Sequence, residues 1–354
     1  MLHHSLHNSR LYIDNVEVKS FLTANFTDNG NNQLQSLNAS FSDPDLEDMP
    51  LFNKKVEFFL NNGSQDGVPL FRGYINNFNA SDSKITIKAL DPRGLMVGDR
   101  IVPIVIDDKD NYDGYTVIQF LHDYIKNKIN LDDTLISTDF LTEMDRPVYM
   151  TGIRGETNPY NSVVELINNK IDDETDTDRT DTNLVFDYFI DIVHGSESSG
   201  PTVRKRRALD GNYDMYFKYG DGIRSMTYRE NSPPSFALGT VEDTNEQVIL
   251  DYGNAPLGAK GLKDKTVQGE SRGELKENLL PYLILEQQYT KEISINCSKG
   301  YTLGIGSIIY IDVPKLNLSG NYAVTGKTVS VGKGNMTCKL NCNNKPIKMS
   351  DYIN

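Results

Sequence analysis

Apolar and polar positions alternate over short stretches at the start of this 354-residue chain, a pattern that predicts β-strands. The stretches cover residues 11–13, 16–18, 37–41, 55–60, 68–78 and 84–90. Residues that favour turns separate them, for example Asp14-Asn15 and Asp66-Gly67. Evenly spaced strands linked by turns are typical of an antiparallel barrel or sandwich. We therefore expect residues 1–100 to form a small N-terminal β-barrel.

A second strand pattern fills residues 289–354, with strands at 293–297, 307–313, 320–331 and 335–342 and a glycine-rich turn at 301–306. In the third strand the apolar face changes parity, from Tyr322 and Val324 to Val329 and Val331, and Gly326 lies between. Such a change predicts a β-bulge at the corner of a second small barrel.

The middle of the chain mixes two periodicities. Helical spacing of apolar residues occurs at 115–128 and 161–171, whereas residues 184–193, 215–219 and 223–228 read as strands. Residues 101–230 are therefore predicted to form an α+β module. Residues 231–288 predict a connecting segment with short helices, and strands from it are candidates to complete the C-terminal barrel. The predicted fold class is mainly β or α+β, with two small antiparallel β-barrel domains flanking the middle module.

The formal charge of −13 argues against a protein that reads nucleic acid, which needs a basic surface. It is compatible with the wall of a channel through which DNA slides. No run of eighteen apolar residues is present, so membrane insertion is not expected. The first residues, Met1 to Ser5, do not resemble a secretory signal, so synthesis in a cytoplasm is expected.

Candidate chemistry is sparse. The acidic run at residues 172–178 lacks the glycine and terminal glutamate of a calcium loop. Gly304-Ile305-Gly306 lacks the Gly-Lys-Ser/Thr ending of a phosphate loop. Cys338 and Cys342 lie four apart in a strand, about 13 Å, too far for a disulfide. We therefore predict no catalytic residues, no metal, no cofactor and no enzymatic activity.

One basic cluster stands out, formed by Arg204, Lys205, Arg206 and Arg207. It follows the Gly- and Ser-rich segment 194–200, which is typical of a flexible loop. An exposed loop is one interpretation. The other is a docking loop for an acidic partner surface or for passing DNA.

Two motifs resemble a known family. The first contains Phe71, Gly73 and Asp91, and the second contains Gly304, Gly306, Gly320 and Tyr322. Both are similar to the barrels of the baseplate central hub protein of contractile phage tails, the late control protein D family, and to the hub portion of type VI secretion spike proteins. The resemblance covers about half of the chain, at its two ends.

The resemblance implies a structural role in the tail baseplate of a virion. Such hubs are homotrimers whose paired barrels form a pseudo-sixfold ring. That ring joins the hexameric tail tube to the trimeric central spike, contacts baseplate wedge or sheath-proximal proteins, and lines the DNA channel.

Two other functions stay open at this point. A tail-associated cell-wall hydrolase could use paired carboxylates. A carbohydrate-binding tail protein could use a small β-barrel with tyrosine and phenylalanine side chains, since the chain has no tryptophan.

Overall fold

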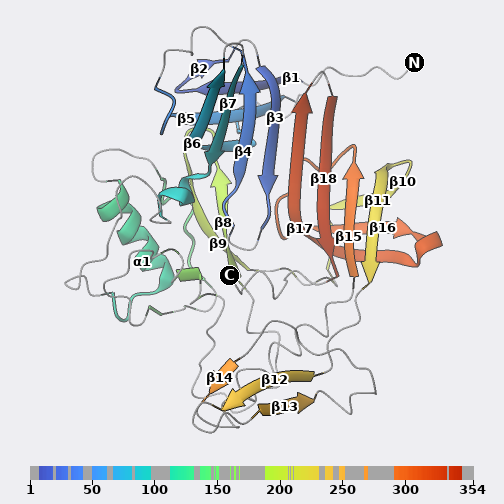
Figure 1. Cartoon of the computed structure of the whole chain (residues 1–354). Helices are drawn as coiled ribbons and strands as arrows, with labels where there is room; N and C mark the ends of the chain where they lie inside the picture. Colours follow the sequence, from blue (N-terminus) through green and yellow to red (C-terminus); the bar gives the residue numbers. More distant parts are fainter. Residues whose placement is uncertain are drawn as a thin grey trace.

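The computed structural model (Figure 1) describes 22 separate parts of the chain. They are residues 8–18, 21–30, 33–42, 50–61, 67–81, 84–96, 112–130, 136–144, 147, 149–150, 160, 163–164, 167, 188–205, 207, 209, 211–230, 236–241, 247–251, 267–269, 291–332 and 335–344. Within them the protein is mainly β, which confirms the predicted fold class.

Seven strands form the N-terminal part of the main sheet. They are β1 (Asn8–Ile13), β2 (Val16–Glu17), β3 (Phe21–Asp28), β4 (Ser36–Phe41), β5 (Lys55–Asn61), β6 (Phe71–Ser81) and β7 (Lys84–Leu90). They pair antiparallel in the order β3-β4-β7-β6-β5-β1-β2. Asp14 and Asn15 make the predicted turn between β1 and β2, with φ of 51° and 68°. Positive φ is tolerated best by Asn, Asp and Gly, which explains the choice of residues.

Six strands close into a ring formed by the second half of the chain. They are β10 (Met215–Tyr219), β11 (Gly222–Glu230), β15 (Lys291–Cys297), β16 (Ile308–Val313), β17 (Leu318–Gly332) and β18 (Asn335–Asn343). The order is β16-β10-β11-β15-β18-β17, and β17 pairs back onto β16. The pairings are antiparallel except at β10, which runs parallel to both β11 and β16. Each strand therefore has two neighbours within the ring.

The strands that complete the ring come from residues 215–230, which the sequence pattern assigns to the middle module. Described strands between 231 and 288 form a separate three-stranded sheet (Figure 1): β12 (Phe236–Val241), β13 (Gln247–Asp251) and β14 (Val267–Gly269). For the described residues, the expectation that strands from 231–288 complete the barrel is thus wrong. Phe217 is fully buried in the same core as Ile309 and Ile311, and this packing holds β10 in the ring.

A β-bulge bends β17 between Val324 and Gly326, where its register against β18 shifts. The bulge predicted from the sequence is therefore confirmed. Before the bulge, Leu318 to Ala323 pair with β16; after it, Lys327 to Gly332 pair with β3. One strand thus belongs to the ring and to the N-terminal sheet, and the two form one continuous sheet of thirteen strands in the described part of the chain (Figure 1).

The middle of the chain contributes η2 (Pro92–Leu95), α1 (Val117–Tyr124), η3 (Ile125–Ile129) and a hairpin of β8 (Tyr188–His194) and β9 (Ser199–Lys205). The helix predicted at 115–128 is confirmed as α1 and η3. A capping box between Thr116 and Gln119 fixes its start. The second predicted helix, at 161–171, lies largely outside the described residues, as do the short helices expected at 231–288.

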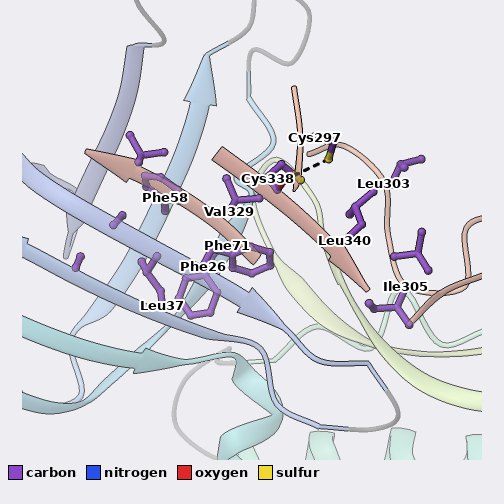
Figure 2. Packing of buried hydrophobic residues seen from close by; sticks show 14 of the residues in the cluster. Phe26, Leu37, Phe58, Phe71, Cys297, Leu303, Ile305, Val329, Cys338 and Leu340 are labelled. Atoms are coloured by element: carbon purple, nitrogen blue, oxygen red, sulfur yellow. Dashed lines mark hydrogen bonds between the residues drawn. The ribbon is translucent and has the colours of Figure 1, made fainter. Parts of the chain in front are cut away.

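Hydrophobic packing follows the continuity of the sheet. One cluster of buried side chains includes both N-terminal and ring residues, and Figure 2 labels Phe26, Leu37, Phe58, Phe71, Leu303, Ile305, Val329 and Leu340 from it. A second cluster surrounds α1 and includes Ile190 and Val203 of the β8–β9 hairpin. The N-terminal sheet and the ring therefore share one core. The domain boundaries expected from the sequence remain a prediction.

Candidate functional site

Buried and partly buried polar side chains gather where the N-terminal sheet, the β8–β9 hairpin and the ring meet. We call this group the polar junction; its members are Asp28, Gln35, Glu57, Arg72, Asp91, Arg93, Asp191, His194, Ser199 and Lys327. Charged groups are rarely buried without partners. The folded state therefore depends on the hydrogen bonds and ion pairs that these groups make with one another.

Asp28 of β3 and Lys327 of β17 are register partners at the point where the ring meets the N-terminal sheet. The Asp28 carboxylate accepts hydrogen bonds from Gln35 Nε2 at 2.9 Å and from the Gly30 amide at 3.2 Å. Burial raises the pKa of Asp28 to about 6, and the nearby charge of Asp191 adds to this shift. Lys327 and Arg93 act in the opposite direction.

The Lys327 ammonium is buried and donates to the Leu303 carbonyl at 2.6 Å and the Tyr301 carbonyl at 3.3 Å. It also lies 5.4 Å from the centre of the Phe26 ring, within the range of a cation–π contact. Burial lowers the pKa of Lys327, while Asp28 opposes that shift. This one side chain therefore connects β17, the turn before β16 and β3.

Asp91, a residue of the first motif, caps the short helix η2. Its carboxylate accepts hydrogen bonds from the Arg93 amide at 2.8 Å and the Gln35 amide at 2.5 Å. The Arg93 side chain donates to the same carboxylate, to the Ile190 carbonyl at 3.1 Å and to the Gln33 carbonyl at 3.0 Å. Burial alone would lower the pKa of Arg93, but Asp91 raises it well above its ordinary value. Asp91 and Arg93 thus hold the β8–β9 hairpin against the N-terminal sheet.

Arg72 makes a second connection to that hairpin. Its Nε donates to Glu57 Oε1 at 2.6 Å. Its two terminal nitrogens donate to the Gly195 carbonyl, to Ser199 Oγ and to the Ser196 carbonyl at 2.8–3.1 Å. Gly195 and Ser196 lie in the turn between β8 and β9, and Ser199 is the first residue of β9. The segment 194–200, expected to be flexible, is therefore an ordered hairpin held by a buried arginine.

Phe71 and Gly73, the other residues of the first motif, flank Arg72 on β6. Phe71 is fully buried, with its ring centre 6.1 Å from that of Phe26 and 6.2 Å from that of His194. A Cβ atom on Gly73 would lie 2.1 Å from the Leu90 carbonyl oxygen, so no larger residue fits without moving the backbone. The motif is structural: it places Phe71 in the core and lets β6 approach β7.

His194, the last residue of β8, contacts two other members of the polar junction. Its Nε2 lies 2.9 Å from Gln35 Oε1, and its Nδ1 lies 2.8 Å from Ser199 Oγ. Because Gln35 Oε1 can only accept, Nε2 carries the proton and Nδ1 accepts from the serine. Burial lowers the pKa of His194 to about 3, and the charges of Arg72, Arg93 and Lys327 contribute. The imidazole is therefore neutral at ordinary pH.

The second motif lies in the ring. Gly306 has a φ of 78°, and its amide donates to the Val324 carbonyl at 2.9 Å. A Cβ atom added to Gly304 would meet nothing within 4 Å. Gly320 pairs with Ile311 across β17 and β16, and Tyr322 is 5% exposed in the ring core. These residues shape the turn before β16 and the start of β17.

The structure corrects the expectation that the whole basic cluster lies in an exposed loop. Arg204 and Lys205 lie in β9 and not in a loop. Arg204 forms an ion pair with Asp191 at 3.2 Å, and Arg207 donates to both carboxylate oxygens of Asp214. Arg206 lies outside the described residues. A docking role for this cluster remains a prediction.

The described residues show neither a candidate metal site nor a candidate membrane-spanning helix. The described residues contain no group of three or more His, Cys, Asp or Glu side chains arranged to hold a metal ion. No helix among them is long and apolar enough to cross a membrane.

Sequence reasoning identified Asp91 but missed most of the polar junction. Arg93 had a local signal, because the Asp91-Pro92-Arg93 order is that of a capped helix start. Asp28 and Lys327 also had one, because each occupies an inward position of a strand: Asp28 lies two residues after Phe26, and Lys327 directly follows Gly326. No signal in the sequence indicates that Asp28 and Lys327, some 300 residues apart, lie opposite each other.

Solved structures of phage tail proteins resemble the chain over nearly its whole length. A tail protein from Neisseria meningitidis MC58 matches with a TM-score of 0.65 and 9% identity, covering 98% of this chain and 99% of its own. The 43 kDa tail protein of prophage MuSo2 from Shewanella oneidensis matches with a TM-score of 0.63 and 10% identity, covering 98% of both chains.

A third match is an E. coli component of the type VI secretion system, described as similar to the T4 bacteriophage tail proteins gp27 and gp5. Its TM-score is 0.57 at 10% identity, and the match covers 96% of this chain and 77% of that one. No protein-family model matches the sequence, and no curated protein does. The chain thus has the fold of phage tail proteins and of this type VI secretion component, which confirms the resemblance at the level of fold.

Proposed function

We propose that the chain is the structural baseplate hub of a phage-type tail. In this role three copies form a pseudo-sixfold ring that joins the hexameric tail tube to the trimeric central spike. The observation that carries the proposal is the continuous sheet in which β17 belongs to both the ring and the N-terminal part. Together with a tail-protein fold over 98% of the chain, it favours a rigid adaptor.

The polar junction supports rigidity. Arg72 and Arg93 each donate to main-chain carbonyls of the β8–β9 hairpin, and Lys327 of the ring lies opposite Asp28 of the N-terminal sheet. Buried charged groups lose much of their stabilisation if the surrounding parts separate, because each would leave an unpaired partner behind. A hub that holds a tube and a spike in a fixed geometry needs this behaviour.

An aromatic surface on the outside of the ring is the candidate contact between copies. Tyr213, Tyr216 and Tyr310 have ring centres 5.5–6.4 Å apart, and Tyr213 is 50% exposed. The Tyr216 hydroxyl donates to Asp312 Oδ2 at 2.6 Å, which fixes its ring. Tyrosine is enriched where proteins bind each other.

The other partners follow from the same role. The tail tube ring and the central spike would bind at opposite faces of the trimer, with baseplate wedge or sheath-proximal proteins outside. The net charge of −13 suits a lumen through which genomic DNA passes without binding. The protein would then be located in the virion baseplate, with no enzymatic activity of its own.

The test compares oligomeric mass between two double variants. Tyr213→Ser with Tyr310→Ser should convert trimers into monomers, because it removes the aromatic surface. Tyr115→Ser with Tyr149→Ser is the matched control, since these tyrosines are 41% and 54% exposed but lie beside α1. Trimers that survive the first change as well as the second would exclude this surface as the contact.

The aromatic surface also favours one alternative, a carbohydrate-binding tail protein, because sugars stack on tyrosine rings. Binding of cell-wall glycan fragments, lost on Tyr213→Ser, would support that function in place of a contact between copies. Retention of glycan binding in the variant would place any such site elsewhere.

A further inference from the structure

Two cysteines lie face to face inside the ring. Cys297 of β15 and Cys338 of β18 are direct register partners in an antiparallel pair. Opposite residues in such a pair have Cα atoms about 4.5–5.5 Å apart, which falls within the range found in disulfides. The Cys297 thiol donates to the Cys338 carbonyl at 3.3 Å, and Figure 2 shows the two side chains pointing toward each other.

The third cysteine lies apart from this pair. Cys342 is opposite Ile293 of β15 and four residues along β18 from Cys338, about 13 Å away. The sequence offers the close spacing of Cys338 and Cys342, and that pair cannot be bridged. The pairing of β15 with β18 selects Cys297 as the partner of Cys338.

The surroundings differ for the two thiols. The contact with Cys297 lowers the pKa of Cys338, and the positive charge of Lys327 contributes, while burial opposes the shift. The contact with Cys338 and burial both raise the pKa of Cys297. Cys338 is therefore the sulfur that ionises first and reacts as the nucleophile.

We propose that Cys297 and Cys338 form an oxidation site, at which hydrogen peroxide converts the two thiols into a cross-strand disulfide. The Cys338 thiolate attacks one peroxide oxygen, the O–O bond breaks, and the displaced hydroxide takes up the thiol proton as water. The product is a sulfenic acid on Cys338. The Cys297 sulfur then attacks the Cys338 sulfur, the S–O bond breaks, and a second water leaves. Two thiols are oxidised and one peroxide is reduced to two waters.

This inference does not rest on the proposed function. The disulfide would tie β15 to β18 and close a loop from residue 297 to residue 338, which restricts the unfolded chain. Because of this restriction, the oxidised ring should unfold at a higher temperature than the reduced one. Both cysteines are 2% exposed in the folded protein, so large reagents do not reach the thiols.

The test uses the full chain and hydrogen peroxide, followed by digestion without reductant and peptide mass analysis. The expected product is a linked peptide pair containing Cys297 and Cys338, lighter by two hydrogens. Cys342→Ser should keep this link, and Cys297→Ser should lose it. Because Cys342 is as buried as Cys297, it controls for the cost of placing a hydroxyl in the ring.

A second measurement does not depend on whether peroxide can reach the buried thiols. The unmodified chain is refolded from urea in a glutathione redox buffer, and the same linked pair is quantified in native buffer and in urea. The native fold should favour the Cys297–Cys338 disulfide over its level in urea by at least about tenfold, because it holds the thiols together. Equal levels in both solutions, or as much Cys338–Cys342 disulfide as Cys297–Cys338, would overturn the proposal.

Discussion

Lys327 and Asp28 lie opposite each other in the strand pair that makes the ring and the N-terminal sheet one structure. Lys327→Met should lower the free energy of unfolding by about 3 kcal/mol, because it removes the cation opposite the buried Asp28 and leaves two carbonyls without their donor. Urea unfolding monitored by tyrosine fluorescence measures this change.

Asp28 and Lys327 should also show a coupling energy in a double-mutant cycle. Asp28→Asn combined with Lys327→Met should cost less than the sum of the two single changes, because removing both charges leaves neither one buried alone. If the two changes add within about 0.5 kcal/mol, the charges do not interact across the strand pair.

Asp28 and His194 should make opposite contributions to the pH dependence of stability. The pKa of Asp28 is raised from 3.8 to about 6, so its contribution is full below the lower value and is lost as pH rises through 6. The pKa of His194 is lowered from 6.5 to about 3, so its contribution is full above 6.5 and is lost as pH falls toward 3. Between pH 4 and 6 the two contributions change with pH in opposite directions, so their effects on the free energy of unfolding cancel.

Single variants should expose each slope. In Asp28→Asn, stability should fall as pH drops from 6 to 4 by about 1.4 kcal/mol per unit; in His194→Asn it should rise by a similar amount. Urea midpoints at several pH values give the slopes, which do not depend on how much each variant loses overall. Identical slopes in the two variants would contradict the assignment.

Arg72→Met should loosen the β8–β9 hairpin. The change removes the donors to the Gly195 and Ser196 carbonyls and the buried hydrogen bond from Arg72 to Glu57. Amide exchange in the turn between β8 and β9 should accelerate more than tenfold, which corresponds to about 1.4 kcal/mol of local stability. Arg224→Met, at an exposed position of β11, should leave the exchange unchanged.

The two glycines of the ring turn should differ sharply. Gly306→Ala should cost about 1–2 kcal/mol, because its φ of 78° is unfavourable for a side chain and the new Cβ would lie 3.2 Å from the Phe189 ring. Gly304→Ala should change stability by less than about 0.5 kcal/mol, since a Cβ there meets nothing within 4 Å. Thermal unfolding of both variants tests the difference.

Local patterns predicted the local parts of this fold. The turn at Asp14-Asn15, the helix that contains α1 and the bulge before Gly326 each depend on residues close together in the sequence. The strand β3 was missed because its inward positions are Ala24, Phe26 and Asp28, and a charged residue breaks the apolar alternation.

The polar junction and the pairing of β17 with β3 depend on contacts between distant residues, which a single sequence does not reveal. The hairpin at 194–200 shows why its composition wrongly predicted a flexible loop. Gly200 is typical of such a loop, yet a Cβ atom added to it would lie 1.9 Å from the Ser137 carbonyl oxygen. Glycine is required there by close packing.

The central claim is that the chain assembles as a hub, and the absolute mass of the purified protein in solution tests it most directly. Light scattering combined with particle images should give three times the 39.8 kDa chain mass and a ring with a central opening. A compact monomer at every concentration measured would contradict the account.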